Sequence, residues 1–170
     1  MTDSAIDIEA TLDDMTQRLR ALLTASGRDD VALIGIHSGG VWIAQALHER
    51  LGTTTPLGEI NITFYRDDFS RIGMHPRVKP SNLPFPVEDR HIVLVDDVLY
   101  TGRTIRAALN EIFDYGRPAS VTLAVLVERG GRELPIQADI IGQTITPAQG
   151  EHVKLLGPEP LVLVTKGTGQ

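Results

Sequence analysis

Residues 91–104 constrain the fold of this chain more than any other part of its sequence. The apolar run at 92–95 is typical of a strand buried on both faces of a parallel sheet. Two adjacent carboxylates, Asp96 and Asp97, follow it directly, and a Thr-Gly-Arg-Thr turn begins four residues later. A pattern of helical period then occupies 105–113. The stretch therefore predicts a strand, a polar turn and a helix, which is the repeating unit of α/β folds.

The rest of the sequence continues this alternation. Further helices are predicted at residues 8–26 and 41–51, and further strands at 31–36, 60–65, 121–127, 139–142 and 161–164. The segment 66–90 is polar and rich in proline, and a connection this long is usually a functional lid or disordered. The pattern predicts one α/β domain spanning residues 1–170, with a mostly parallel central sheet flanked by helices.

Composition excludes several other classes of protein. The chain of 170 residues has no cysteine, so a disulfide framework, a thiolate zinc site and a cysteine nucleophile are excluded. Its net charge of −6 argues against wholesale binding of a polyanion. No apolar stretch approaches the ~20 residues that span a bilayer, and the first residues are acidic. We therefore expect a cytoplasmic protein without a membrane partner.

The aspartate pair suggests a ligand that carries hydroxyl groups. Ligands of open α/β sheets bind at the carboxyl ends of strands, where Asp96 and Asp97 are expected. Two neighbouring carboxylates repel each other and lose hydration there, so they persist most readily beside hydroxyl donors, a metal ion or solvent. Ribose hydroxyls and a hydrated magnesium ion meet this requirement. The alternative is a solvated strand end that binds nothing.

The turn after the aspartates suggests an anion site. Unpaired N–H groups and the positive end of a helix dipole attract anions, and Gly102 allows the backbone to approach closely. Thr101 and Thr104 add hydroxyl donors, whereas Arg103 either adds charge or points to water. Together with the aspartates, this pattern indicates a sugar phosphate. A phosphoacceptor signalling domain is a weaker alternative, because it requires a late lysine at a strand end and Lys166 lies beyond the last predicted strand.

Residues 91–104 resemble the phosphoribosyl pyrophosphate (PRPP) motif of type I phosphoribosyltransferases. The narrower resemblance is to the PyrR family, whose members are uracil phosphoribosyltransferases and regulators of pyrimidine operons. Residues 95–104, 58–68 and 126–135 carry it, and the similarity runs from about 31 to 142. It implies the type I phosphoribosyltransferase fold with a small hood, and a reaction in which uracil displaces pyrophosphate from magnesium-bound PRPP to give UMP.

The resemblance also implies roles for individual residues. Asp96 and Asp97 would hold the ribose hydroxyls and, through ribose or water, Mg²⁺. The residues implied for the 5-phosphate are Val98, Leu99, Tyr100, Thr101, Gly102, Arg103 and Thr104. Those implied for the pyrophosphate loop are His37, Ser38, Gly39 and Gly40, and those for the base hood are Arg129, Gly130 and Arg132. Arg66, Arg71, Arg77 and Lys79 belong to a loop that would close over the site, with Arg66 among the catalytic residues.

Two features bear on the base. Tyr100 stands where purine-using relatives carry an aspartate, which favours a pyrimidine. In the hood, Gly131 stands where a histidine is typical, and Glu128 and Arg132 are equally compatible with surface charges.

The pyrophosphate loop departs from the family pattern. Regulators of this type read Lys-Thr-Arg-Gly, whereas this chain has a histidine and a glycine, His37 and Gly39, in place of the two cations. We therefore expect weakened turnover, and if the loop has lost a cation, Gly39→Arg should raise turnover. Backbone N–H groups of the two glycines can still bind an anion.

Binding to RNA is not favoured by the charge pattern. The first helix sets Glu9, Asp13 and Asp14 against Arg18 and Arg20, so no basic stripe forms and counterion release should be small. The alternative function is a catalytically weak RNA-binding or nucleotide-sensing regulator on the same fold, with UMP as effector. A homo-oligomer is expected. Trp42 is expected in the core or at a subunit contact, and the histidines show no metal-binding spacing.

Overall fold

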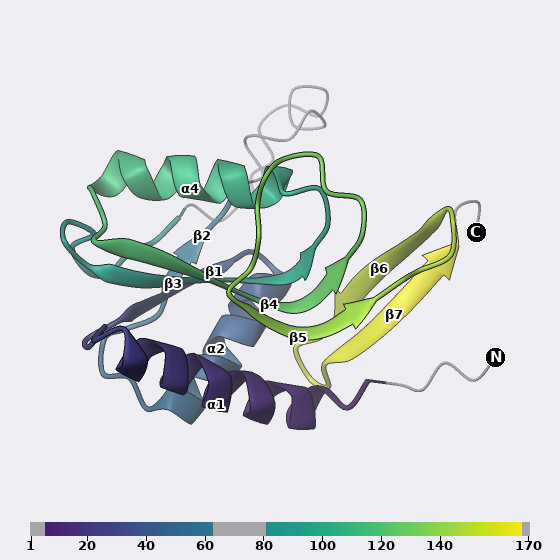
Figure 1. Ribbon diagram of the computed structural model, residues 1–170, viewed down its shortest axis with the longest axis horizontal. Helices are drawn as coiled ribbons and strands as arrows, with labels where there is room; N and C mark the ends of the chain where they lie inside the picture. Colours follow the sequence, from purple (N-terminus) through teal and green to yellow (C-terminus); the bar gives the residue numbers. More distant parts are fainter. Residues whose placement is uncertain (1–5, 63–80, 168–170) are drawn as a thin grey trace.

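The computed structural model describes residues 6–62 and 81–167, and its centre is a five-stranded parallel sheet (Figure 1). In spatial order the strands are β2 (Gly58–Ile60), β1 (Ala32–Ile36), β3 (His91–Leu99), β4 (Ser120–Arg129) and β5 (Ile140–Ile145). The chain first places β2 on one side of β1 and then returns to place β3 on the other side. The order of the strands therefore reverses between β1 and β3, where open α/β sheets bind their ligands.

Within the described residues, three helices cover the sheet in two layers. Helices α1 (Ile8–Ala25) and α2 (Gly39–Leu51) lie on one face and α4 (Arg103–Tyr115) lies on the other (Figure 1). Strand β3 contributes to both cores, because Val93 and Val95 pack in the α1–α2 core while Ile92 and Leu94 pack in the α4 core. This confirms the prediction of a strand buried on both faces. The predicted α/β class with a mostly parallel sheet flanked by helices is also confirmed.

Capping residues explain where helix α1 begins and where helix α2 ends. The carboxylate of Asp7 accepts a hydrogen bond from the N–H of Ala10 at 3.0 Å and so satisfies one of the free donors at the start of α1. Helix α2 ends at Gly52, which has φ +70°, a left-handed conformation that glycine adopts without strain.

A separate antiparallel hairpin follows the sheet. It consists of β6 (Glu151–Leu156) and β7 (Val162–Gly167), and it lies beyond β5 (Figure 1). The sequence pattern predicts the strand at 161–164 but misses its partner at 151–156. Leu155 of β6 is buried in the α1–α2 core, and Trp42 of α2 packs beside the hairpin turn at Gly157.

Two predictions need correction or stay untested. Strand β3 does not stop before the aspartates but continues to Leu99, with Val98 and Leu99 paired to β4. The strand predicted at 60–65 is wrong in its bounds, because β2 spans Gly58–Ile60 and neither Asn61 nor Ile62 belongs to a strand. Residues 63–65 and the predicted lid residues Arg66, Arg71, Arg77 and Lys79 lie outside the described residues. In the described ranges, no helix has the length and apolar character needed to cross a bilayer.

Candidate functional site

The polar residues predicted to act together come from the carboxyl ends of β1 and β3. These strands are direct neighbours, with Ile34 beside Leu94 and Gly35 beside Val95. Loop 37–40 follows β1, and the turn 100–104 follows β3. The structure therefore brings the predicted pyrophosphate loop, aspartates and phosphate-binding turn to one edge of the sheet.

The two aspartates have different environments. Asp96 is buried, with 5% of its surface exposed, and its Oδ1 accepts the N–H of Asp97 at 2.8 Å. Asp97 is partly buried, and its Oδ1 accepts the N–H of Val98 at 2.8 Å. Both carboxylates are thus oriented by the backbone of their own strand. An oriented pair of this kind can accept hydrogen bonds from adjacent hydroxyl groups of a sugar.

The two glycines of loop 37–40 lie directly against the aspartates. A Cβ atom at Gly39 would stand 2.2 Å from Asp97 Oδ2, and one at Gly40 would stand 2.7 Å from the carbonyl oxygen of Val95. Neither distance is compatible with a side chain unless β3 or Asp97 moves. Close approach to the backbone of β3 therefore requires glycine at Gly40, whereas a side chain at Gly39 would displace the Asp97 carboxylate. This argues against the expectation that Gly39→Arg raises turnover.

His37 connects the same loop to β2. Its N–H donates to the carbonyl oxygen of Ile60 at 2.9 Å, and its Nε2 lies 3.4 Å from Glu59 Oε2. That nitrogen is buried and makes no hydrogen bond of acceptable geometry within the described residues. The side chain is therefore directed toward Glu59. Sequence reasoning did not single out Glu59, whose charge stands alone in a short apolar strand.

The turn 100–104 has the geometry of an anion-binding helix start. Gly102 caps α4 with φ +93°, and the N–H of Arg103 donates to Thr101 Oγ1 at 3.1 Å. The first N–H groups of a helix have no partner within the helix, and although Thr101 takes up that of Arg103, the N–H groups after it are candidate donors for a ligand. Arg103 Nε lies 2.8 Å from Glu133 Oε1, so this side chain is ion-paired at the surface.

The predicted hood packs on the turn. The hood is predicted at residues 129–135, and we extend the term to 129–136 because Ile136 also lies against the turn. The guanidinium of Arg129 lies 4.1 Å from the centre of the Tyr100 ring, and Gly131, with φ +118°, would clash with that ring if it carried a Cβ atom, at 2.5 Å. Gly130 has no such neighbour within 4 Å. Arg132 donates to the carbonyl oxygen of Tyr100 and is therefore an internal contact and not a free surface charge.

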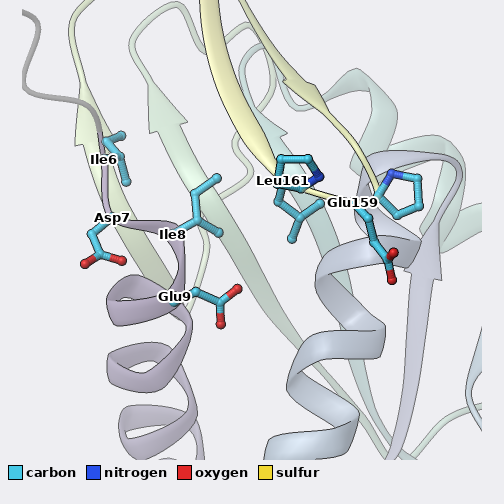
Figure 2. Close-up of a pocket in the computed structure, with 8 residues that line it drawn as sticks. Ile6, Asp7, Ile8, Glu9, Glu159 and Leu161 are labelled. Carbon is cyan, nitrogen blue, oxygen red and sulfur yellow. The ribbon is translucent and has the colours of Figure 1, made fainter.

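Other candidate residues have structural roles. His48 Nε2 lies 2.8 Å from the carbonyl oxygen of Thr55, and Trp42 is a partly buried packing residue. Within residues 6–62 and 81–167, no three His, Asp or Glu side chains come together to hold a metal ion. A cavity of about 690 Å³ lies between the start of α1 and the turn that holds Glu159 and Leu161 (Figure 2). It shares no residue with the strand-end site.

This protein is a phosphoribosyltransferase by class. The features that define the class are the five-stranded parallel sheet, its switch point between β1 and β3, and the aspartate pair before a phosphate-type turn. The model of the phosphoribosyl transferase domain matches residues 6–156. The chain is 60% identical to the "Bifunctional protein PyrR" of Nitrosococcus oceani, across 92% of this chain and 90% of that one. The protein of the same name from Pseudomonas paraeruginosa is 56% identical, across 89% of each chain. This chain belongs to the PyrR family of phosphoribosyltransferases.

Solved structures agree on the fold. A hypoxanthine phosphoribosyltransferase of Trypanosoma cruzi matches with a TM-score of 0.67 at 20% identity, over 86% of this chain and 80% of that one. The hypoxanthine phosphoribosyltransferase of Staphylococcus aureus matches with a TM-score of 0.63 at 17% identity, over 88% of this chain and 80% of that one. The type I phosphoribosyltransferase fold predicted from the sequence is thereby confirmed.

Proposed function

We propose that this chain transfers the phosphoribosyl group of PRPP to uracil and releases UMP and pyrophosphate. The observation that carries the proposal is the placement of Asp96 and Asp97 between loop 37–40 and the turn 100–104, at the switch point of the sheet. Membership of the PyrR family supports the same reaction. The roles assigned below to single residues are part of the proposal.

Each group at the strand ends has a task in this reaction. The turn 100–104 binds the 5-phosphate through N–H groups at the start of α4. Asp96 and Asp97 accept hydrogen bonds from the ribose hydroxyls and stabilise the positive charge that grows on the ring as pyrophosphate leaves. Loop 37–40 binds the departing pyrophosphate with backbone N–H groups. Catalysis consists of positioning and charge stabilisation, without a covalent intermediate on the protein.

The aspartate pair fits a magnesium ion that arrives with its substrate. Mg²⁺ is commonly bound by one or two carboxylates together with substrate phosphates, so it does not require a cluster of protein ligands. Asp97 is only partly buried, and Asp96 stands next to it. Both carboxylates would contact the ion through ribose or water. Bound there, the ion supplies neutralisation of the pyrophosphate charge.

The hood and the turn support a pyrimidine as the acceptor base. Tyr100 stands in the turn beside the hood, and its ring is covered on one side by Arg129. A phenol ring at this position lacks the carboxylate that would act on a purine. The proposal also includes cations that stabilise the leaving pyrophosphate. These are Arg66, Arg71, Arg77 and Lys79, with Arg66 as a catalytic residue.

A screen of acceptor bases tests the function. The protein is incubated with PRPP and Mg²⁺ together with uracil, orotate, hypoxanthine or guanine, and product nucleotide is quantified by chromatography. We expect UMP to form at a rate well above that of every other nucleotide. Preferential formation of another nucleotide would reassign the base, and failure of all four bases together with tight UMP binding would favour a regulator without turnover.

Regulation of pyrimidine biosynthesis is proposed as a second role. The word "bifunctional" in the names of relatives with 55–60% identity supports it. UMP is the natural effector for such a role, because it is the product held by the same turn and hood. We propose that one domain spanning residues 1–170 carries both roles.

A further inference from the structure

The hood and the turn 100–104 are joined by their main chains. The carbonyl oxygen of Thr101 accepts hydrogen bonds from the N–H groups of Glu133 and Leu134, at 2.9 and 3.1 Å. A Cβ atom at Gly102 would stand only 3.0 Å from Ile136. Two loops separated by about thirty residues in the sequence are therefore in direct contact at the start of α4.

Arg132 adds a side-chain hydrogen bond between the hood and the turn, and it makes further hydrogen bonds within the hood and to β4. Its Nη1 donates to the carbonyl oxygen of Tyr100 and, at 3.5 Å, to that of Arg129. Its Nε donates to the carbonyl oxygen of Ile136 at 2.8 Å, and its Nη2 donates to Glu128 Oε1. The planar guanidinium thus joins the end of β4, both sides of the hood and the first residue of the turn. Only arginine can supply donors in these several fixed directions.

The pairing with Glu128 holds this arrangement in place. The two side chains are 25% and 22% exposed, so solvent screens their attraction only partly. Glu128 itself is fixed at the end of β4, where it stands beside Leu99 of β3 in the sheet register. A residue of the rigid sheet therefore sets the position of Arg132, and Arg132 sets the position of the Tyr100 carbonyl.

We propose that Arg132 is a positioning residue that orients the turn 100–104 for the 5-phosphate and does not itself touch the substrate. Its nitrogens are engaged by protein oxygens on Tyr100, Arg129, Ile136 and Glu128. Backbone N–H groups bind a phosphate only if they converge on it, so a small shift of the turn weakens binding. The inference rests on the proposed phosphate-binding role of the turn.

The test compares two ligands that use different parts of the site. Ribose 5-phosphate requires the turn, whereas pyrophosphate requires loop 37–40, and neither ligand contains a base. For Arg132→Lys we expect the inhibition constant of ribose 5-phosphate and the KM of PRPP to rise roughly tenfold, as expected when a charge-assisted hydrogen bond is weakened. The inhibition constant of pyrophosphate should stay unchanged, and kcat should fall less than KM rises. Arg132→Gln should give a larger effect in the same direction.

Two further variants complete the design. Arg90→Lys alters another arginine of low exposure, at 19%, which pairs with Asp30 before the start of β3, and it should leave both inhibition constants unchanged. Glu128→Gln keeps Arg132 but removes its carboxylate partner, so it should weaken ribose 5-phosphate alone, by less than Arg132→Lys does. It also serves as the test if the Arg132 variants do not fold.

The outcomes separate this inference from the proposed function. Equal loss of both ligands would show general damage to the fold and would overturn the positioning role. Unchanged affinity for ribose 5-phosphate in Arg132→Lys and Glu128→Gln would overturn it as well. Failure of the wild-type chain to bind ribose 5-phosphate would instead overturn the role of the turn on which the inference depends.

Discussion

Gly39 is the residue at which the structure most changes the interpretation of the site. The sequence comparison treats it as the loss of a cation, whereas the structure gives it a steric role, because a Cβ atom there would stand 2.2 Å from Asp97 Oδ2. The carboxylate is held by the N–H of Val98 and cannot turn aside without breaking that hydrogen bond. The glycine therefore keeps Asp97 in the orientation that a ribose would meet.

Replacement of Gly39 tests this steric role. We expect Gly39→Ala to weaken PRPP binding by about tenfold, because the methyl group displaces the Asp97 carboxylate by a fraction of an ångström or more. Gly39→Arg should lower turnover and not raise it. Calorimetric titration with PRPP and Mg²⁺ measures the first effect and initial rates measure the second. Gly167→Ala is the matched control, because a Cβ atom at Gly167 would meet nothing within 4 Å and the residue ends β7, outside the loop, the turn and the hood. A faster Gly39→Arg enzyme would restore the lost-cation interpretation.

The aspartate pair supports a second prediction at this scale. Asp96→Asn and Asp97→Asn should each weaken PRPP binding by about 2 kcal/mol, since each removes a charged acceptor of a hydroxyl hydrogen bond. Asp114→Asn, at an exposed position on α4, should leave binding unaltered. Isothermal calorimetry on the three variants decides the matter. If Asp96→Asn and Asp97→Asn both bind PRPP with wild-type affinity, these residues do not bind the ribose.

Sequence reasoning predicts the kinds of residue at the site but not their spacing. Asp96, Asp97 and the Thr-Gly-Arg-Thr turn follow a strong strand pattern, so their position at a strand end follows from chain order alone. The approach of Gly39 to Asp97 depends on the lateral packing of β1 against β3, which no local pattern encodes. The role of Arg132 depends in the same way on a contact between distant loops.

Among the elements, the β6–β7 hairpin is the one that local pattern describes least well. Its first strand carries Glu151, His152 and Lys154, and only Leu155 is buried, so the alternation is too weak to predict a strand. Pairing with β7 supplies the missing stabilisation through backbone hydrogen bonds. In contrast, β3 and β4 are predicted well because both of their faces are buried.

Trp42 reports on how this hairpin is attached. It is the one tryptophan in the sequence, it lies on α2, and it packs beside Gly157 at the hairpin turn. Trp42→Ala should lower the free energy of unfolding by about 2 kcal/mol, below the loss expected for a fully buried aromatic residue because Trp42 is only partly buried. Urea denaturation followed by circular dichroism measures the change. A loss below about 0.5 kcal/mol would show that the hairpin contact contributes little.

The same tryptophan gives a second readout in the intact chain. A Cβ atom at Gly157 would stand 2.7 Å from Leu161 and 3.2 Å from the Trp42 ring, so Gly157→Ala should shift the hairpin turn and alter the fluorescence of Trp42. Gly167→Ala, where a Cβ atom meets nothing within 4 Å, is the control. An unchanged emission spectrum in Gly157→Ala would show that the hairpin turn does not pack against Trp42.

At the scale of the whole molecule, charge decides which partners are favoured. The net charge is −6, and Arg18, Arg50 and Arg90 are paired with carboxylates and so contribute little to a basic surface. A protein that binds RNA through phosphates must release counterions, and its affinity then falls steeply with salt. Weak RNA binding by the surface as a whole stays our prediction.

Anisotropy with a labelled RNA hairpin tests this expectation. We expect no saturation at micromolar protein in about 150 mM salt, within the range of non-specific binding, and little change between low and moderate salt. Submicromolar affinity with a steep dependence on salt would show a basic surface that the overall charge conceals. The measurement is repeated with UMP present, because a regulator that responds to its product would change affinity with it. The expected homo-oligomer stays a prediction. Light scattering on the same samples measures the molar mass and so tests the oligomeric state.

The contact between Thr101 and the hood has a consequence for the redesign of this enzyme. The carbonyl oxygen of Thr101 accepts hydrogen bonds from Glu133 and Leu134, and the Tyr100 ring contacts both Arg129 and Gly131, so the two loops should be exchanged as one unit. A chimera that receives only the hood of a purine-using relative would lose these bonds. Transplanting residues 98–104 together with 128–136 would preserve them, so altered base preference should require that both segments be grafted from the same donor.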